Sequence, residues 1–248
     1  MELDVAQAHV AYMLVEMAVA AIRTSALTKD YGSGQGLFDL DLQVSPQQIF
    51  GCLGPDGSGK TTTIRLLMSM IRPTRGSAYV FGLDCIREAV EVKRRVGYVP
   101  DETPEFGSMR GGEIVAYLTG LRGGVHKDRV SELAERFDLD LGRRHREYSR
   151  DDRQKLSIVL AFMHDPDLLI LDEPSKHLDE RGTAELHALI DEARAGGATI
   201  LLASRSAAEV ESQCDVVGLL RRGKLSRVMR IEDLPLELEE RSRKALPP

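Results

Sequence analysis

A glycine-rich stretch with a single lysine has the clearest chemical signature in the sequence. GPDGSGKTT, at residues 54–62, fits the pattern G-x-x-x-x-G-K-[ST] and lies between an apolar run and a helical run. In that setting the backbone N–H groups of the loop surround phosphate oxygens, and the N-terminus of the helix faces them. A glycine-rich loop that is only a turn is the structural alternative, and the strand-to-helix setting argues strongly against it.

The residue types of this loop assign a role to two side chains. Lys60 is expected to reach the β- and γ-phosphates of a nucleotide, and the Thr61 hydroxyl to ligate Mg²⁺. The candidate phosphate-binding residues are Gly54, Pro55, Asp56, Gly57, Ser58, Gly59, Lys60, Thr61 and Thr62.

Two acids follow an apolar run further along the chain, in LLILDEP at residues 168–174. Asp172 is placed to hold Mg²⁺, usually through water, and Glu173 to polarise an attacking water. A strand that ends in solvated carboxylates explains either acid alone. Such a strand end is a poor explanation for two adjacent acids in a chain that also has a phosphate loop.

The elements that must position these residues are indicated by the pattern of apolar residues. Continuous apolar runs that alternate with helical stretches are typical of a parallel sheet covered on both faces, whereas residues 37–44 alternate with period two, as a half-exposed antiparallel strand does. Residues from about 101 to 165 are helical and predict a subdomain inserted in the connections of the sheet. The predicted strands are 20–27, 37–44, 47–54, 76–82, 96–100, 168–172, 198–204, 215–220 and 223–229, and the predicted helices are 60–71, 112–121, 127–137 and 152–164.

Length and composition limit the classes of protein that fit. The chain has 248 residues, enough for one large α/β domain, and a net charge of −6, which argues against nucleic acid as a partner. Its three cysteines are far apart and fit neither a disulfide framework nor a zinc site, so a reducing cytosol is expected.

The two ends of the chain differ from the middle. Residues 1–16 are interpreted as an extension upstream of a natural start at Met17, and a short amphipathic helix at residues 5–22 is the alternative. The domain is then expected to cover residues 17–230. Residues 231–248 are charged, end in Pro-Pro, and are expected to form a tail with one loose helix.

The order and spacing of these motifs resemble an ATP-binding cassette (ABC) ATPase, the nucleotide-binding subunit of a membrane transporter. LTKDYG at 27–32 resembles the first strand of the family, VGYVPDE at 96–102 the strand before the Q-loop, and YSRDDRQKL at 148–156 the signature. SKHLDE at 175–180 resembles the D-loop and LLASRS at 201–206 the switch strand. Within the family, the chain is most similar to bacterial cassettes with a separately encoded permease, of which drug and antibiotic exporters are common examples.

The resemblance implies a fold and a set of partners. The implied fold is a P-loop NTPase core with a mainly parallel sheet, an antiparallel β subdomain and an inserted α-helical subdomain. ATP and Mg²⁺ are the implied ligands, and Tyr31 would stack on the adenine. A transmembrane permease and a second cassette, in a homodimer or heterodimer, are the implied partners, which places the chain at the cytoplasmic, inner face of the membrane.

Three functional positions depart from the family pattern. Asp101 stands at the position of the Q-loop glutamine, which helps to place Mg²⁺ and the attacking water, and Arg205 stands at the position of the switch histidine. In the signature, Ser149 is kept, whereas Arg150 and Asp151 replace two glycines. Asp101, Glu173 and Arg205 are therefore the candidate catalytic residues, and Thr61, Asp101 and Asp172 the candidate metal ligands.

Asp151 has two interpretations that are compatible. In the family arrangement it brings a carboxylate towards the ATP of the partner cassette, where two unit charges at 4 Å repel by about 1 kcal/mol in water. Residues 149–152 also fit a capping box, so the two acids in the first turn stabilise the helix by roughly 0.3–1 kcal/mol each. A better helix cap is thus a worse phosphate site.

The sequence therefore predicts an ATPase subunit that energises a permease, with hydrolysis slowed by the three departures. The main alternative is a regulatory cassette, with little or no hydrolysis, that is paired with a competent one. A soluble ABC protein of DNA repair or translation and a P-loop kinase are weaker alternatives. ABC proteins of DNA repair or translation usually have a long coiled-coil insertion or two cassettes in one chain, and this sequence shows neither. A P-loop kinase would leave the segments that resemble the D-loop and the signature unexplained.

Overall fold

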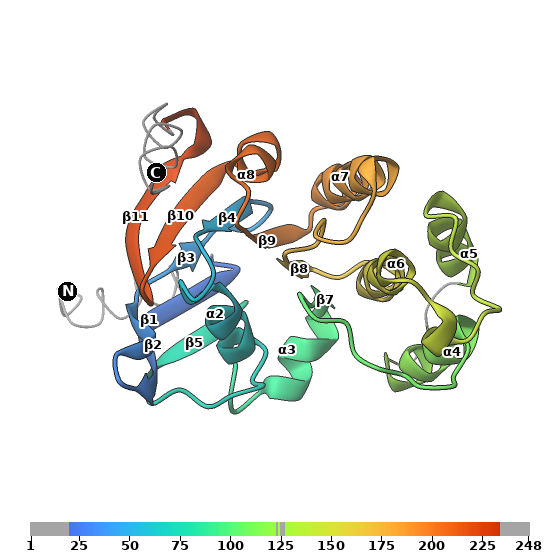
Figure 1. The fold of residues 1–248 in the computed structure, drawn as a ribbon. Coiled ribbons are helices and arrows are strands. Elements are labelled where there is room, and N and C mark those ends of the chain that lie inside the picture. Colours follow the sequence, from blue (N-terminus) through green and yellow to red (C-terminus); the bar gives the residue numbers. More distant parts are fainter. Residues whose placement is uncertain (1–19, 123, 125–126, 234–248) are drawn as a thin grey trace, which may run out of the picture.

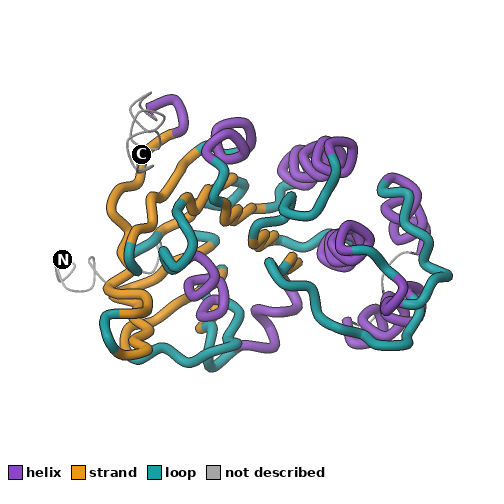
Figure 2. The backbone as a smooth tube through the Cα atoms, viewed as in Figure 1, coloured by secondary structure: helices purple, strands orange, loops and turns teal. Residues whose placement is uncertain are grey.

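The computed structural model describes residues 20–122, 124 and 127–233, which form two sheets and a group of helices (Figures 1 and 2). The predictions for residues 1–16 and for a helix in the C-terminal tail fall on residues 1–19 and 234–248, which lie outside the described residues. Among the residues that are described, none of the helices is long and apolar enough to cross a membrane.

The larger sheet has six strands in the order β11-β10-β4-β9-β8-β7. Every neighbouring pair from β10 to β7 is parallel, and β11 is antiparallel to β10. The predicted fold class, with a mainly parallel sheet, is therefore confirmed. The strands are β4 (Ile49–Leu53), β7 (Val96–Val99), β8 (Leu168–Asp172), β9 (Thr199–Ser204), β10 (Val216–Arg221) and β11 (Lys224–Arg230).

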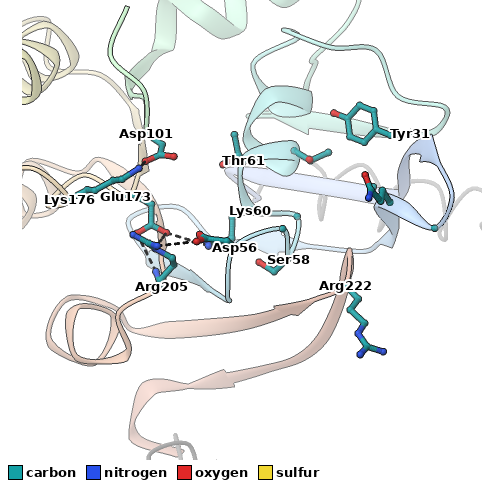
Figure 3. Close-up of a pocket in the computed structure, with 16 residues that line it drawn as sticks. Tyr31, Asp56, Ser58, Lys60, Thr61, Asp101, Glu173, Lys176, Arg205 and Arg222 are labelled. Atoms are coloured by element: carbon teal, nitrogen blue, oxygen red, sulfur yellow. Dashed lines mark hydrogen bonds and ion pairs between the residues drawn. The ribbon is translucent and has the colours of Figure 1, made fainter. Parts of the chain in front are cut away.

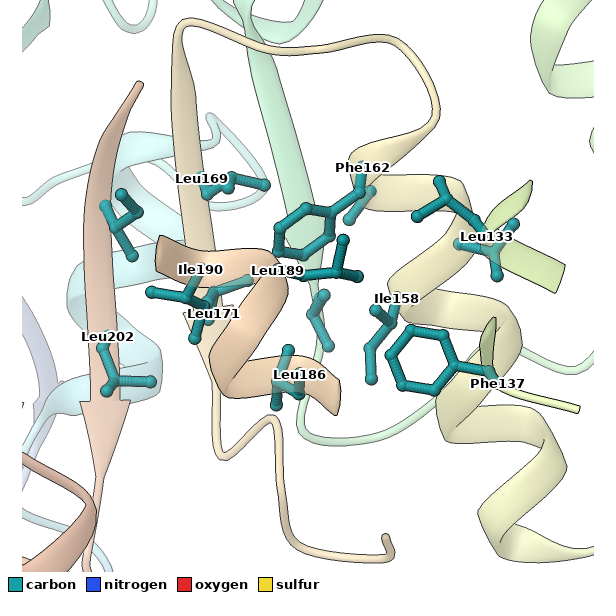
Figure 4. Close-up of a cluster of buried hydrophobic side chains, with 14 of the residues drawn as sticks. Leu133, Phe137, Ile158, Phe162, Leu169, Leu171, Leu186, Leu189, Ile190 and Leu202 are labelled. Atoms are coloured by element: carbon teal, nitrogen blue, oxygen red, sulfur yellow. The ribbon is translucent and has the colours of Figure 1, made fainter. Parts of the chain in front are cut away.

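Apolar residues on both faces explain why the central strands are continuous hydrophobic runs. In β8, Leu168 and Ile170 belong to one buried cluster, and Leu169 and Leu171 belong to another on the opposite face. Figure 4 shows the second cluster between the sheet and the helices, with Phe162 packed among leucines. Because side chains alternate along a strand, both faces of this sheet must be covered to remove them from water.

The smaller sheet is antiparallel and has the order β2-β1-β5-β6, with β3 also paired to β1. The single strand predicted at 37–44 is wrong, because the chain leaves the ladder between β2 and β3. At this break the Thr24 hydroxyl donates to the Leu40 carbonyl and accepts from the Leu42 N–H. The strands are β1 (Ile22–Gly32), β2 (Gln35–Leu40), β3 (Gln43–Val44), β5 (Arg75–Val80) and β6 (Leu83–Asp84).

Helix α2 (Lys60–Leu67) follows the glycine-rich loop and is four residues shorter than predicted. Ser69 adopts a left-handed conformation, with φ of 52°, and the Met70 N–H donates to the Arg65 carbonyl at 2.8 Å. These two features close the helix before the proline that was expected to end it. The other helices of the core are α3 (Ala89–Arg95), α7 (Glu180–Ala195) and α8 (Ala207–Gln213).

Three helices gather on the side of the molecule away from the antiparallel sheet (Figure 1). They are α4 (Gly111–Arg122), α5 (Lys127–Arg136) and α6 (Arg150–Phe162), and each agrees with its predicted range to within two residues. Short 3₁₀ turns at His145–Glu147 and Ile231–Asp233 complete the described elements. The first precedes α6, so it leads the chain into the segment that resembles the signature.

Candidate functional site

The glycine-rich loop joins β4 to α2, as the motif requires. Gly59 caps the helix with a φ of 113°, a conformation that side chains rarely adopt. A Cβ on Gly54 would lie 2.4 Å from the Leu220 carbonyl oxygen and 2.6 Å from the Ser58 hydroxyl. Both glycines are therefore needed for the loop to turn tightly against β10 and present its N–H groups at the start of the helix.

This loop forms one wall of a cavity of about 580 Å³ (Figure 3). Residues that lie far apart in the sequence, from Tyr31 to Arg222, meet here. The lining residues are Tyr31, Gly34, Gln35, Gly36, Asp56, Gly57, Ser58, Gly59, Lys60, Thr61, Thr62, Asp101, Glu173, Lys176, Arg205 and Arg222.

Lys60 is buried and lies within its own loop. Its ammonium donates to the Gly54 carbonyl at 2.6 Å and lies 3.3 Å from Glu173 Oε1. A buried cation needs such partners, and phosphate oxygens can replace them because they carry more charge. The position fits the predicted contact with phosphates.

Asp172 ends β8 and is completely buried. Neither of its carboxylate oxygens accepts a hydrogen bond from any residue that the structure describes. Burial raises the pKa of Asp172 to about 6; the neighbouring Thr61 hydroxyl and the Lys60 ammonium oppose this increase, and the Asp101 and Glu173 carboxylates add to it. An unpaired buried carboxylate is costly unless a cation approaches it, so the residue fits a Mg²⁺ site together with the Thr61 hydroxyl.

Among the described residues, the side chains of His, Cys, Asp and Glu form no group of three that could hold a metal ion. A magnesium ion of the kind expected here does not need one. It is bound through one or two carboxylates, with substrate phosphates and water supplying the remaining ligands.

Glu173 follows Asp172 in a left-handed conformation, with φ of 49°. Non-glycine residues in this region are strained by about 1–3 kcal/mol and are frequent at functional sites. Its carboxylate accepts from the Arg205 N–H at 3.3 Å and is contacted by Lys60 and by the Arg205 side chain. The residue thus lies beside Lys60 in the pocket, a position that fits the general base expected from the sequence.

Arg205 follows β9 and bridges two carboxylates (Figure 3). Its guanidinium lies 3.1 Å from Asp56 Oδ2 and 3.5 Å from Glu173 Oε1. These two carboxylates raise the pKa of Arg205 further above its usual range. The sequence predicted the residue in the site but not its pairing with the phosphate loop.

Asp101 is held by a lysine that the sequence analysis missed. Lys176 donates to Asp101 Oδ1 at 2.5 Å, and both residues line the pocket. The lysine lies in the segment that resembles the D-loop, which is the only signal for it in the sequence. The Asp101 carboxylate is therefore neutralised locally before it can approach Mg²⁺ or water.

Tyr31 is half exposed and lies across the pocket from Asp101 and Lys176 (Figure 3). The Lys29 ammonium lies 5.5 Å from the centre of its ring. An exposed aromatic ring at the mouth of a phosphate pocket is suited to stacking on a base. Arg222, at the turn between β10 and β11, also lines the pocket and was missed by the sequence analysis, as were Gly34, Gln35 and Gly36.

Ser149 and Asp151 lie outside this pocket, at the N-terminus of α6. The predicted capping box is present: Ser149 Oγ accepts from the Asp152 N–H at 3.0 Å, and Asp152 Oδ2 accepts from the Ser149 N–H at 3.0 Å. Asp151 takes no part in the box and pairs with Lys155 at 2.7 Å. Lys155 therefore offsets the Asp151 charge.

The fold and this pocket define a P-loop NTPase of the cassette type, and comparison with known proteins agrees. The family model described as ABC transporter matches residues 37–176. The daunorubicin resistance ATP-binding protein DrrA3 of Streptomyces coeruleorubidus is 36% identical over 214 residues, covering 84% of this chain and 68% of that protein. The bacitracin transport ATP-binding protein BcrA of Bacillus licheniformis is 34% identical over 229 residues, which cover 91% of this chain and 73% of that protein.

A solved structure of an ATP-binding subunit of an ABC transporter has a similar fold, with a TM-score of 0.80 and 25% sequence identity. The similarity covers 88% of this chain and 93% of the chain in that structure. The chain belongs to the ABC transporter family. It is an ATP-binding subunit of that family, so the predicted class of function is confirmed.

Proposed function

We propose that this chain binds MgATP between its own phosphate loop and the signature of a second cassette, hydrolyses it slowly, and thereby drives a membrane permease. The observation that carries the proposal is the convergence of Lys60, Glu173 and Arg205 at one end of the pocket, beside the unpaired Asp172. Tyr31 at the other end is suited to the adenine.

Each group has a role that follows from its position. The loop N–H groups and Lys60 bind the β- and γ-phosphates, while Thr61 and Asp172 would hold Mg²⁺. When bound, the magnesium ion neutralises charge that develops on the phosphate oxygens. Glu173 orients a water and accepts its proton, which requires its carboxylate to be released from the cations that now contact it.

The location of the signature supports a second cassette as a partner. Ser149 and the N-terminus of α6 are suited to a phosphate but lie outside this chain's own pocket. A head-to-tail pair would bring each signature to the other chain's ATP. The transport step then takes place at the inner face of the membrane, on a permease that the pair contacts.

Slow hydrolysis follows from the charges at three positions. Asp151 faces the partner's polyanion with only Lys155 to offset it. Asp101 is bound to Lys176, and Arg205 cannot accept or release a proton as a histidine can. A regulatory cassette with no hydrolysis of its own is the second candidate, and these same ion pairs favour it. Co-purification separates the two: a homodimer on the permease supports the motor, and a competent second cassette supports the regulator.

Nucleotide binding by the purified full-length chain tests the proposal. We expect MgATP to bind in the micromolar range typical of such enzymes and Lys60→Ala to weaken binding at least about tenfold, because a charge-assisted hydrogen bond is lost. Arg94→Ala, in an exposed ion pair with Glu91 on α3, is the matched control and should leave the affinity unchanged. Equal affinity of wild type and Lys60→Ala would contradict the proposal.

Two relatives act in daunorubicin resistance and bacitracin transport, as their names state. We therefore infer export of a drug-like compound as the transport that this subunit energises. Co-expression with the permease that co-purifies should raise resistance of a sensitive host to such a compound, and Lys60→Ala should abolish the increase. Resistance that is unaffected by Lys60→Ala would contradict a role for this chain.

A further inference from the structure

A second cavity, beside the nucleotide pocket, brings the three candidate metal ligands together. This neighbouring cavity has a volume of about 800 Å³, shares Thr61 and Asp101 with the pocket, and is also lined by Asp172. Burial is the main cause of the raised pKa of Asp172, and the Asp101 charge adds to it, so the two carboxylates are near enough to interact. A metal ion held by Asp172 and Thr61 is therefore also within the electrostatic reach of Asp101.

Lys176 already occupies the Asp101 carboxylate (Figure 3). Its ammonium donates to Asp101 Oδ1 at 2.5 Å, and only 32% of the lysine side chain and 29% of the aspartate side chain are exposed. The Lys176 N–H donates to the Glu173 carbonyl at 3.1 Å, so the turn after β8 delivers the ammonium to this place. A partly buried pair is screened less by water and salt than an exposed one, so it holds Asp101 more firmly.

A lysine and a metal ion compete for the same carboxylate oxygens, because both are compact, hard cations. Lys176 has taken Asp101, whereas the Asp172 oxygens accept no hydrogen bond from the residues that the structure describes. The neighbouring cavity thus contains these two carboxylates but offers only Asp172 uncommitted to a divalent cation.

The number of available carboxylates affects which divalent cation is preferred. Mg²⁺ keeps several waters and is bound through one or two carboxylates together with the phosphates of a substrate. Ca²⁺ takes about six to eight oxygen ligands in a more flexible geometry, so an additional carboxylate favours it more. A site with one available carboxylate therefore favours Mg²⁺, and a second carboxylate would weaken that preference.

We propose that Lys176 keeps Asp101 out of the ligand set of the metal, so that Asp172 is the one protein carboxylate on the metal and Mg²⁺ is favoured over Ca²⁺. The inference rests on the proposed function, because the metal enters this site with the nucleotide. Lys176 is then a specificity-determining residue that acts through Asp101. It assigns to an ion pair the carboxylate that the sequence alone assigns to the metal.

Nucleotide affinity with and without metal tests the proposal. The dissociation constant of a non-hydrolysable ATP analogue is measured calorimetrically with excess Mg²⁺, with excess Ca²⁺ and with a chelator. The full-length wild type, Lys176→Met, Asp101→Asn and the double variant form a double-mutant cycle. The ratio of the constant without metal to the constant with metal gives the contribution of that metal to binding. Thermal unfolding of each variant checks that it folds.

Two further variants serve as controls. Lys176→Arg keeps a cation beside Asp101 and should retain the wild-type preference for Mg²⁺. Arg75→Met removes the cation from an ion pair with Asp39, in which the nitrogen and oxygen atoms are 2.7 Å apart, outside both cavities. It should change the contribution of neither metal.

In Lys176→Met we expect the contribution of Ca²⁺ to rise about tenfold and that of Mg²⁺ about threefold or less, because a second carboxylate becomes available. The gain of Ca²⁺ relative to Mg²⁺ should disappear in the Asp101→Asn background, where no carboxylate is released. Asp101→Asn alone should keep the wild-type preference for Mg²⁺.

Two outcomes overturn the inference while leaving the proposed function intact. One is a change of affinity in Lys176→Met that is absent, or equal with Mg²⁺, Ca²⁺ and the chelator; an equal loss would make Lys176 a ligand of the phosphates. The other is a relative gain of Ca²⁺ that persists in the Asp101→Asn background. A wild type that does not bind the analogue contradicts the proposed function itself, and the inference fails with it.

Discussion

At the scale of single residues, the site brings together four carboxylates. Asp56, Asp101 and Glu173 line the pocket, and Asp172 lines the neighbouring cavity, which shares Thr61 and Asp101 with it. Three of them contact a cation supplied by another segment, whereas Asp172 accepts no hydrogen bond from the described residues. The unpaired acid is the one expected to hold Mg²⁺, so the protein leaves uncompensated the group whose partner is a metal ion.

Asp172 therefore destabilises the metal-free protein at neutral pH, and this is testable. Its pKa is about 6 in the fold against 3.8 for an ordinary aspartate, so ionisation costs folding about 1–3 kcal/mol above pH 6 and nothing below about pH 4, where both states are protonated. Without Mg²⁺, Asp172→Asn should be more stable than wild type at pH 8 by about that amount. The gain should shrink between pH 6 and pH 4.

Urea unfolding at several pH values measures this difference. Asp39→Asn, at an exposed ion pair, is the control that should show no such gain. An Asp172→Asn variant less stable than wild type at pH 8 would show that the carboxylate is already compensated. Adding Mg²⁺ and nucleotide should stabilise wild type and leave Asp172→Asn largely unaffected.

The motif residues of the site could be predicted from the sequence, and the ion pairs that they form could not. Lys60 and the acids at 172 and 173 belong to short segments whose context is local. Arg205 is 149 residues from Asp56, and Lys176 is 75 residues from Asp101. Only the order of strands in the sheet brings these pairs together, and residue types alone do not state that order.

At the scale of elements, the start of α6 shows how one turn serves two purposes. Asp152 belongs to the capping box, and Asp151, beside it, pairs only with Lys155 among the ion pairs of the described residues. The helix therefore does not need Asp151 for its cap. Because the two acids have different partners in the same turn, replacing each one alone distinguishes the contribution of the cap from that of the ion pair.

We expect Asp152→Ala to lower the free energy of unfolding by about 1–2 kcal/mol, as loss of a helix cap does. Asp151→Ala should lower it by only about 0.5 kcal/mol, the typical contribution of a helix ion pair between residues four apart. Chemical denaturation of both variants measures the contrast, and Asp151→Ala serves as the matched control. Equal losses would mean that Asp151 is held by more than Lys155.

The elements themselves were predicted well where the pattern was local. The buried strands and the three helices of the inserted subdomain agree because burial on both faces, or on one face of a helix, leaves a period in the sequence. Strand β1 runs five residues beyond its predicted end, and α3, α7 and α8 were not predicted. The pattern itself gave a wrong prediction at 37–44 and at the end of α2. In both places a single contact, from the Thr24 hydroxyl or from Ser69 in a left-handed turn, overrides the pattern.

At the scale of the whole molecule, the proposed ATP site is incomplete in one chain. The N-terminus of α6 does not line the pocket, so in the proposed arrangement a second cassette would supply the signature. In a homodimer of the proposed kind, two Asp151 carboxylates would face phosphates. The charge at this one position consequently acts twice on the stability of the closed dimer.

Asp151→Gly should therefore favour ATP-dependent dimerisation. Removing about 1 kcal/mol of repulsion at each of two sites raises the association constant by up to about thirtyfold, and Lys155 makes the observed gain smaller. Sedimentation with MgATP in a Glu173→Gln background, where hydrolysis is suppressed, measures the dimer fraction. A dimer fraction that does not increase would mean that Asp151 lies away from the partner's phosphates.

The measurement that tests the account most directly is steady-state ATP turnover by the purified chain, alone and with its permease. We predict a rate below about 1 s⁻¹ for wild type and a severalfold increase in Arg205→His and in Asp151→Gly, because each reversion removes one obstacle to hydrolysis. A wild-type rate well above about 1 s⁻¹, or reversions that leave the rate unchanged, would contradict the account.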